Sequence, residues 1–141
     1  MVVSPRAWSL HPRLEQDTAP VGDLPLSRLL VHNDANYPWL LLVPRRPEAC
    51  EIIDLDEADR QQLMAEIAMA SRALKAVTMC DKLNVAAIGN VVPQLHLHVL
   101  ARRRDDAAWP KPVWGTVPAC AYDLAERERF VAALRRELAI A

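Results

Sequence analysis

The fold is decided by residues 93–100, which read PQLHLHVL. Apolar and polar residues alternate there with a period of two, which predicts a half-buried β-strand, expected over 91–101. Side chains of such a strand point to opposite faces in turn, so Gln94, His96 and His98 are expected on one face. Because two of the four histidines of the chain lie on that face, it is the candidate site.

The composition is typical of a single globular domain, expected over residues 1–141: 52% of the residues are hydrophobic, and the net charge is −1. This balance argues against a nucleic-acid polymer as partner. The longest apolar run, Trp39–Val43, is too short to span a membrane, and the N-terminus lacks a signal-type apolar region. Cys50, Cys80 and Cys120 form no pair motif, which favours reduced thiols and a cytoplasmic location.

The sequence before the histidines predicts an antiparallel hairpin. Apolar runs over 26–32 and 39–43 are typical of strands, and the polar residues 33–38 between them are typical of a turn. A further strand is predicted over 82–88, directly before the strand that carries the histidines.

Two helices are predicted around this sheet. One runs for about 20 residues from its cap Asp56, with apolar residues at spacings of three and four. The other is the C-terminal helix, which begins after Asp123. We expect 1–27 to be an irregular arm with a short helix near 12–15, and 102–120 to be an irregular loop rich in tryptophan and proline. This order predicts an α+β fold with an antiparallel sheet.

His96 and His98 allow several kinds of chemistry. A neutral imidazole is a good nucleophile toward phosphorus, and a second ring two residues away can donate a hydrogen bond or a proton to the same phosphate. His-x-His spacing also occurs in metal sites, although the sequence nominates no clear third ligand. Two histidines on a solvated strand face without a function are the remaining interpretation.

The same segment, continued by Ala101 and Arg102, resembles the signature of the histidine triad (HIT) superfamily, His-φ-His-φ-His-φ-φ, where φ is apolar. The turn at 89–93, the strand at 38–44 and the helix from Asp56 are similar to segments of that family. The resemblance implies a HIT-like α+β domain, usually a homodimer, that acts on the α-phosphate of nucleotides. It implies neither a cofactor nor a catalytic metal.

The resemblance also implies roles for the residues of the signature. His96 is the expected nucleophile, which forms a nucleotidyl-histidine intermediate, and His98 is expected to contact the phosphate and the leaving group. Gln94 takes the first position of the pattern, where its amide can form hydrogen bonds but cannot carry protons. Trp39 takes a position where many members have a further histidine, so one possible relay is lost.

Four other residues are candidates for nucleotide contact. The resemblance places Asn90 near the phosphate, and Gly89 permits close approach of the backbone; the alternative for both is a turn. Asn33 and Asp34 either contact the ribose or form an ordinary Asx turn.

Three further features have simple interpretations. Arg102–Arg104 are expected on a solvated face, with attraction of anions as the alternative. Residues 109–115 either cover a nucleotide site or pack against their own core or a dimer contact. His32 is expected to be a polar residue of an edge strand.

We therefore expect a HIT-type hydrolase or nucleotidyl transferase acting on a nucleoside phosphoramidate, a dinucleoside polyphosphate or a related nucleotide. Its expected partners are that nucleotide and a second copy of the chain, with no nucleic-acid polymer and no membrane. A nucleotide-binding dimer without catalysis is the alternative, and a metal-binding protein that uses His96 and His98 is the third hypothesis.

Overall fold

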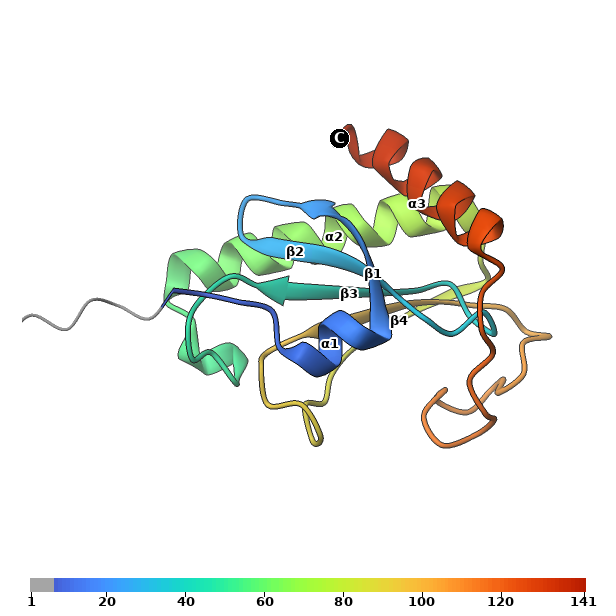
Figure 1. Ribbon diagram of the computed structural model, residues 1–141, viewed down its shortest axis with the longest axis horizontal. Helices are drawn as coiled ribbons and strands as arrows, with labels where there is room; N and C mark the ends of the chain where they lie inside the picture. The colour runs from blue at the N-terminus through green and yellow to red at the C-terminus, as the bar shows by residue number, and fades with distance from the viewer. Residues whose placement is uncertain (1–6) are drawn as a thin grey trace, which may run out of the picture.

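The computed structural model describes residues 7–141, which form one antiparallel sheet with helices on both of its faces (Figure 1). The strands are β1 (Thr18–Asp23), β2 (Ser27–His32), β3 (Trp39–Pro44), β4 (Lys82–Ala87) and β5 (Leu97–Arg102). The helices are α1 (Pro12–Asp17), the 3₁₀ turn η1 (Ile52–Asp54), α2 (Glu57–Thr78) and α3 (Leu124–Leu138). The strand order is β1-β2-β3-β5-β4, and every neighbouring pair is antiparallel. The predicted α+β class is confirmed.

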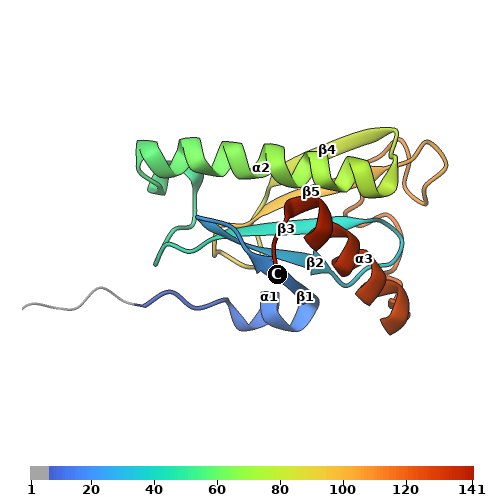
Figure 2. The same ribbon diagram turned by 90° about the horizontal axis from the view of Figure 1, so that it is seen from above.

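The sheet carries a hydrophobic cluster on each face. Figure 2 shows α2 and α1 on opposite sides of the sheet. On the α2 side, the strand residues Leu40, Leu42 and Val99 belong to one buried cluster with Leu74 of α2 and Leu134 of α3. On the α1 side, a second cluster contains Leu14, Tyr37, Trp39, Leu41, Leu100 and Val113. The side chains of β3 and β5 therefore alternate between two buried environments, and the histidines lie on the α1 side.

The two predicted helices form where their caps indicate. Asp56 accepts a hydrogen bond from the backbone N–H of Asp59 at 2.8 Å, and α2 then runs for 22 residues. Asp123 accepts the N–H of Ala125 at 2.8 Å and begins α3. Each side-chain oxygen satisfies an N–H that the first turn of a helix leaves without a partner.

The N-terminal region is more regular than predicted. Residues 1–6 of the expected arm lie outside the described residues, and the short helix predicted near 12–15 forms as α1. The remainder includes an edge strand, β1, in which Ala19 and Val21 are buried on one face. Pro20 and Gly22 hide this alternation in the sequence, and the pairing with β2 shifts register between them. An edge strand tolerates such residues because one of its sides has no ladder to complete.

The strand of the histidines is shorter than predicted, because it begins at Leu97 and not at residue 91. Pro93 has no N–H to donate to a ladder. The N–H of Leu95 donates to the carbonyl oxygen of Ala49 at 2.9 Å, outside the sheet. His98 therefore lies within β5 and His96 directly precedes it, whereas Gln94 lies outside the strand altogether.

Beyond β5, residues 103–123 form turns and bends without a helix or strand, and α3 follows. None of the helices in residues 7–141 is long and apolar enough to cross a membrane.

Candidate active site

A cavity of about 280 Å³ opens on the α1 side of the sheet. Its wall is built by α1, by β2 and β3, by the turn before β5 and by Trp114 of the loop after β5. The polar side chains that line it are Arg13, Asp17, His32, Asn90, His96 and His98. The other lining residues are apolar apart from Gly89, so much of the wall around the histidines is apolar.

The backbone selects one tautomer of the His96 ring. Its Nδ1 lies 2.6 Å from the carbonyl oxygen of Gln94, and His96 is 7% exposed. A carbonyl oxygen only accepts hydrogen bonds, so Nδ1 must carry the hydrogen. The neutral ring then has its free lone pair on Nε2, the atom that can act as a nucleophile or a base.

The ring of His98 is held in the opposite tautomer. The indole Nε1–H of Trp39 donates to Nδ1 of His98 at 3.0 Å, within the buried part of the site. An indole N–H only donates, so Nδ1 of His98 must be the acceptor, and the hydrogen of the neutral ring lies on Nε2. The two rings thus differ in function: His96 offers a lone pair and His98 offers a donor.

Neighbouring rings enclose His98 and keep it neutral. Its ring centroid lies 5.0 Å from that of His96 and 5.1 Å from that of Trp114, both in edge-to-face arrangements. Burial, with smaller contributions from His96 and His32, lowers the pKa of His98 to about 3. At neutral pH His98 therefore acts as an uncharged hydrogen-bond donor.

The expectation that His32 is a polar residue of an edge strand is wrong. The strand β2 lies between β1 and β3, and His32 lines the cavity. Its ring is 4.3 Å from that of Trp39, centroid to centroid. Burial lowers the pKa of His32, and Asp17 and Asp34 oppose that shift in part.

The four predicted nucleotide contacts separate into two pairs. Gly89 and Asn90 line the cavity, and Gly89 has a φ of 66°, a backbone conformation that favours glycine. Asn33 and Asp34 do not line it. Asp34 accepts the N–H groups of Asn36 and Cys120, and Asn33 accepts a hydrogen bond from Arg127. The Asx-turn interpretation therefore describes Asp34, and Asn33 ties the turn to α3.

Gln94 lies on the wall of a different hollow, together with residues 7–9 and 47–50. Its side-chain Oε1 accepts the N–H of His11 at 2.8 Å, and its Nε2 donates to the carbonyl oxygen of Ser9 at 2.9 Å. The expectation that this side chain lies on the same face as the histidines is wrong, because β5 does not begin until Leu97 and Gln94 lies outside it.

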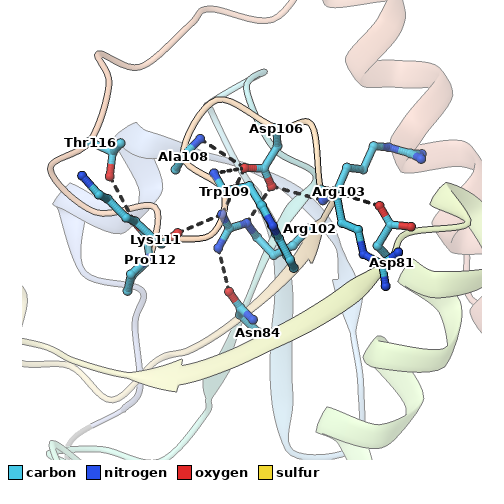
Figure 3. A network of polar contacts seen from close by, with 11 residues as sticks. Asp81, Asn84, Arg102, Arg103, Asp106, Ala108, Trp109, Lys111, Pro112 and Thr116 are labelled. Carbon is cyan, nitrogen blue, oxygen red and sulfur yellow. Dashed lines mark hydrogen bonds and ion pairs between the residues drawn. The ribbon is translucent and has the colours of Figure 1, made fainter.

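Arg102 is not on a solvated face, unlike the exposed Arg103 and Arg104. Its guanidinium donates two hydrogen bonds to Asp106, at 2.7 and 3.0 Å, one to Asn84 and one to the carbonyl of Lys111 (Figure 3). This buried network fixes the start of the loop that carries Trp114.

The loop 109–115 packs on its own core, one of the expectations for it, and it also lines the cavity. Val113 is buried in the cluster on the α1 side of the sheet, whereas Trp114 lines the cavity against Trp39 and His98. Trp109 lies against the guanidinium of Arg102, with 5.6 Å between the ring centroid and Cζ. The loop therefore packs on its own core and closes one side of the site.

The residues that α1 adds to the cavity could not be found from sequence. Arg13, Leu14 and Asp17 lie about 80 positions from the histidines, and no local pattern links the two segments. The position of Trp39 is easier to predict once β3 and β5 are paired. Leu41 pairs with His98, and Trp39 lies on the same face of β3 as Leu41. Among residues 7–141, no group of three or more His, Cys, Asp and Glu side chains is arranged to hold a metal ion.

A small antiparallel sheet with two histidines in different tautomers in the wall of a cavity defines a histidine-based site on an α+β domain. Residues 13–105 match the HIT domain family, and the chain belongs to that family. The segment that carries the histidines lies inside the matched range.

Several solved structures are similar to this chain over nearly all of its length. A histidine triad protein from Bradyrhizobium japonicum is 64% identical, with a TM-score of 0.93, covering 94% of this chain and 99% of that one. One from Marinobacter aquaeolei is 40% identical, with a TM-score of 0.92 and coverages of 95% and 98%. One from Sinorhizobium meliloti is 39% identical, with a TM-score of 0.90 and coverages of 92% and 96%. A comparison with curated proteins finds no significant match.

Proposed function

We propose that the chain is a nucleotide hydrolase or nucleotidyl transferase in which His96 attacks the α-phosphorus of the substrate. The observation that carries this proposal is the 2.6 Å contact between Nδ1 of His96 and the carbonyl of Gln94. It leaves the Nε2 lone pair free on a ring that lines the cavity. Membership of the HIT family supports the same reaction class.

The proposed reaction has two displacement steps. In the first, Nε2 of His96 forms a bond to phosphorus while the bond from phosphorus to the leaving group breaks, and the leaving group takes that electron pair, together with a proton from solvent where it is an amine. In the second, a water oxygen attacks the same phosphorus, and Nε2 leaves with its lone pair restored. The water releases one proton to solvent, and the product is a nucleoside monophosphate.

His98 supports both steps as a donor. Its Nε2–H can form a hydrogen bond with a phosphate oxygen or with the leaving group, and Trp39 at Nδ1 keeps this hydrogen in place. Because its low pKa keeps the ring neutral, His98 stabilises developing negative charge as an uncharged hydrogen-bond donor. Asn90, which also lines the cavity, supplies an amide that can bind another phosphate oxygen.

The test is a substrate panel of nucleoside phosphoramidates, dinucleoside polyphosphates and nucleotide sugars, with wild type and His96→Ala compared. We expect kcat to fall more than about 10³-fold in the variant, since the nucleophile is removed. The melting temperature and circular dichroism should stay close to wild type. Rapid quenching with a labelled nucleotide should trap the label on His96.

Two results would contradict the proposal. Full turnover by His96→Ala would exclude this nucleophile. Nucleotide binding by calorimetry, with neither adduct nor turnover across the panel, would favour the non-catalytic binding protein.

A further inference from the structure

The side chain of Gln94 forms one accepted and one donated hydrogen bond, and both go to the N-terminal segment. Its oxygen binds the N–H of His11, and its NH₂ group binds the carbonyl of Ser9, so the amide straddles Leu10 with one bond on each side. Bonds of this kind fix both the position and the direction of a backbone segment, because a shift of one residue would break both.

His11 passes this restraint directly to α1. The side chain of His11 accepts the N–H of Arg13 at 3.0 Å, and its carbonyl accepts the N–H of Glu15 at 3.0 Å. His11 is thus the N-cap of α1 and, through its own N–H, the partner of Gln94. A displacement of His11 would therefore move the first turn of the helix.

The helix α1 depends on such a restraint because it is short. It has six residues, of which only Leu14 is buried, and a helix of this length is not stable by itself in water. Yet three of its residues, Arg13, Leu14 and Asp17, line the same cavity as His96 and His98. Arg13 is the positively charged side chain of that wall, and its Nε lies 3.3 Å from Asp17.

Orientation of the nucleophile does not require this side chain. Nδ1 of His96 binds the backbone carbonyl of residue 94, which any amino acid at that position would supply. Residue 94 therefore has two separable functions: its carbonyl orients His96, and its amide side chain restrains residues 9–11.

We propose that Gln94 is a positioning residue that holds α1, and with it Arg13, as the substrate-binding wall of the cavity. This inference rests on the proposed function, since it assumes an anionic substrate in the cavity. It assigns Gln94 to the strength of substrate binding and removes it from the set of groups that perform the chemical step.

The kinetic test is Gln94→Ala compared with wild type. We expect KM to rise about tenfold, the effect of losing one to two net hydrogen bonds, while kcat changes less than about twofold because the carbonyl remains. Arg13→Gln should raise KM to a similar extent. The double variant should resemble the single variants, because both changes remove the same contact. Gln94→His should not increase kcat.

A second measurement tests the restraint without any substrate. Amide hydrogen exchange at His11 should become about tenfold faster in Gln94→Ala, because its N–H loses its acceptor. Exchange in β5 should not change.

The outcomes separate the two proposals. A large loss of kcat at unchanged KM would overturn the positioning role and make Gln94 catalytic. Unchanged exchange at His11 would show that Gln94 does not hold the segment. If wild type turns over no nucleotide in the panel, the proposed function fails, and the exchange measurement still decides whether the restraint exists.

Discussion

At the scale of single residues, the site holds two histidine rings in opposite tautomers. The partner of His96 is a carbonyl and the partner of His98 is an indole N–H, and neither partner can reverse its role. By the family resemblance, Trp39 stands where many members have a histidine. It does not simply remove a possible proton relay, because it has a function of its own. It fixes which nitrogen of His98 carries the hydrogen.

Trp39→Phe tests this function of the indole. The variant keeps an aromatic ring but removes the only hydrogen that Trp39 can donate, so both neutral tautomers of His98 become accessible. We expect ¹⁵N chemical shifts to report a mixture of tautomers in the variant and the Nε2–H form alone in wild type. The kcat should fall by roughly tenfold, the value of about one hydrogen bond.

Trp114→Phe is the matched control for the tautomer. Trp114 contacts the ring of His98 edge to face, and its replacement leaves the Trp39 hydrogen bond in place. We expect His98 to stay in the Nε2–H form in this variant. A single Nε2–H tautomer in Trp39→Phe would show that Trp39 does not set it.

At the scale of elements, the loop after β5 is held by a buried ion pair. The side chains of Arg102 and Asp106 are 2% and 7% exposed, and their closest contact is 2.7 Å. Asn84 of β4 and the carbonyl of Lys111 bind two of the other three guanidinium hydrogens. A pair that is satisfied in this way is costly to break from one side, because the other charge is left buried.

Arg102→Ala should therefore lower the free energy of unfolding by about 3–5 kcal/mol. Urea denaturation followed by circular dichroism measures this change. Arg104→Ala is the control, since that side chain is exposed, and its effect should stay within about 0.5 kcal/mol. A loss below about 1 kcal/mol for Arg102→Ala would place the pair with ordinary surface ion pairs.

The elements that could be predicted from sequence are those with local signals. The hairpin of β2 and β3 follows from two apolar runs around a polar turn, and α2 follows from its cap and its periodicity. The strand β1 was missed because Pro20 and Gly22 interrupt its pattern.

The site could be predicted only where its residues follow one local alternation in the sequence. His96 and His98 follow from their alternation, whereas the environment of Gln94 depends on the long-range bond from Leu95 to Ala49. No local sequence pattern reveals such a pairing, so the orientation of the Gln94 side chain could not be predicted from the sequence. The nucleotide partner and the homodimer stay predictions.

At the scale of the whole molecule, buried groups with shifted pKa values determine how stability depends on pH. The folded state keeps His98 neutral down to a pKa of about 3, whereas an unfolded histidine takes up its proton near pH 6.5. The pKa of Asp106 is also lowered, but in a carboxyl group this shift favours the charged form. Burial alone would raise its pKa, but Arg102 and backbone N–H groups outweigh burial and lower it.

These shifts predict a protein that loses stability in two steps on acidification. Above about pH 6.5 His98 is neutral in both states and contributes no pH dependence. Between about pH 6.5 and 3 the unfolded chain binds a proton that the folded chain rejects, so stability falls by up to about 1.4 kcal/mol per pH unit for this residue. His32, whose pKa is also lowered by burial, adds to the same slope.

Below about pH 4 the second step begins, because the unfolded Asp106 is protonated first and the stability from its lowered pKa disappears as the pH falls further. Urea midpoints at pH 7.5, 5.5 and 4.0 measure the upper step. His98→Gln isolates the contribution of His98, since its midpoint should change less between pH 7.5 and 5.5 than that of wild type. Equal slopes in the two proteins would mean that folded His98 takes up its proton over the same pH range as the unfolded chain, and its proposed role as a neutral donor throughout this range would then fail together with this prediction.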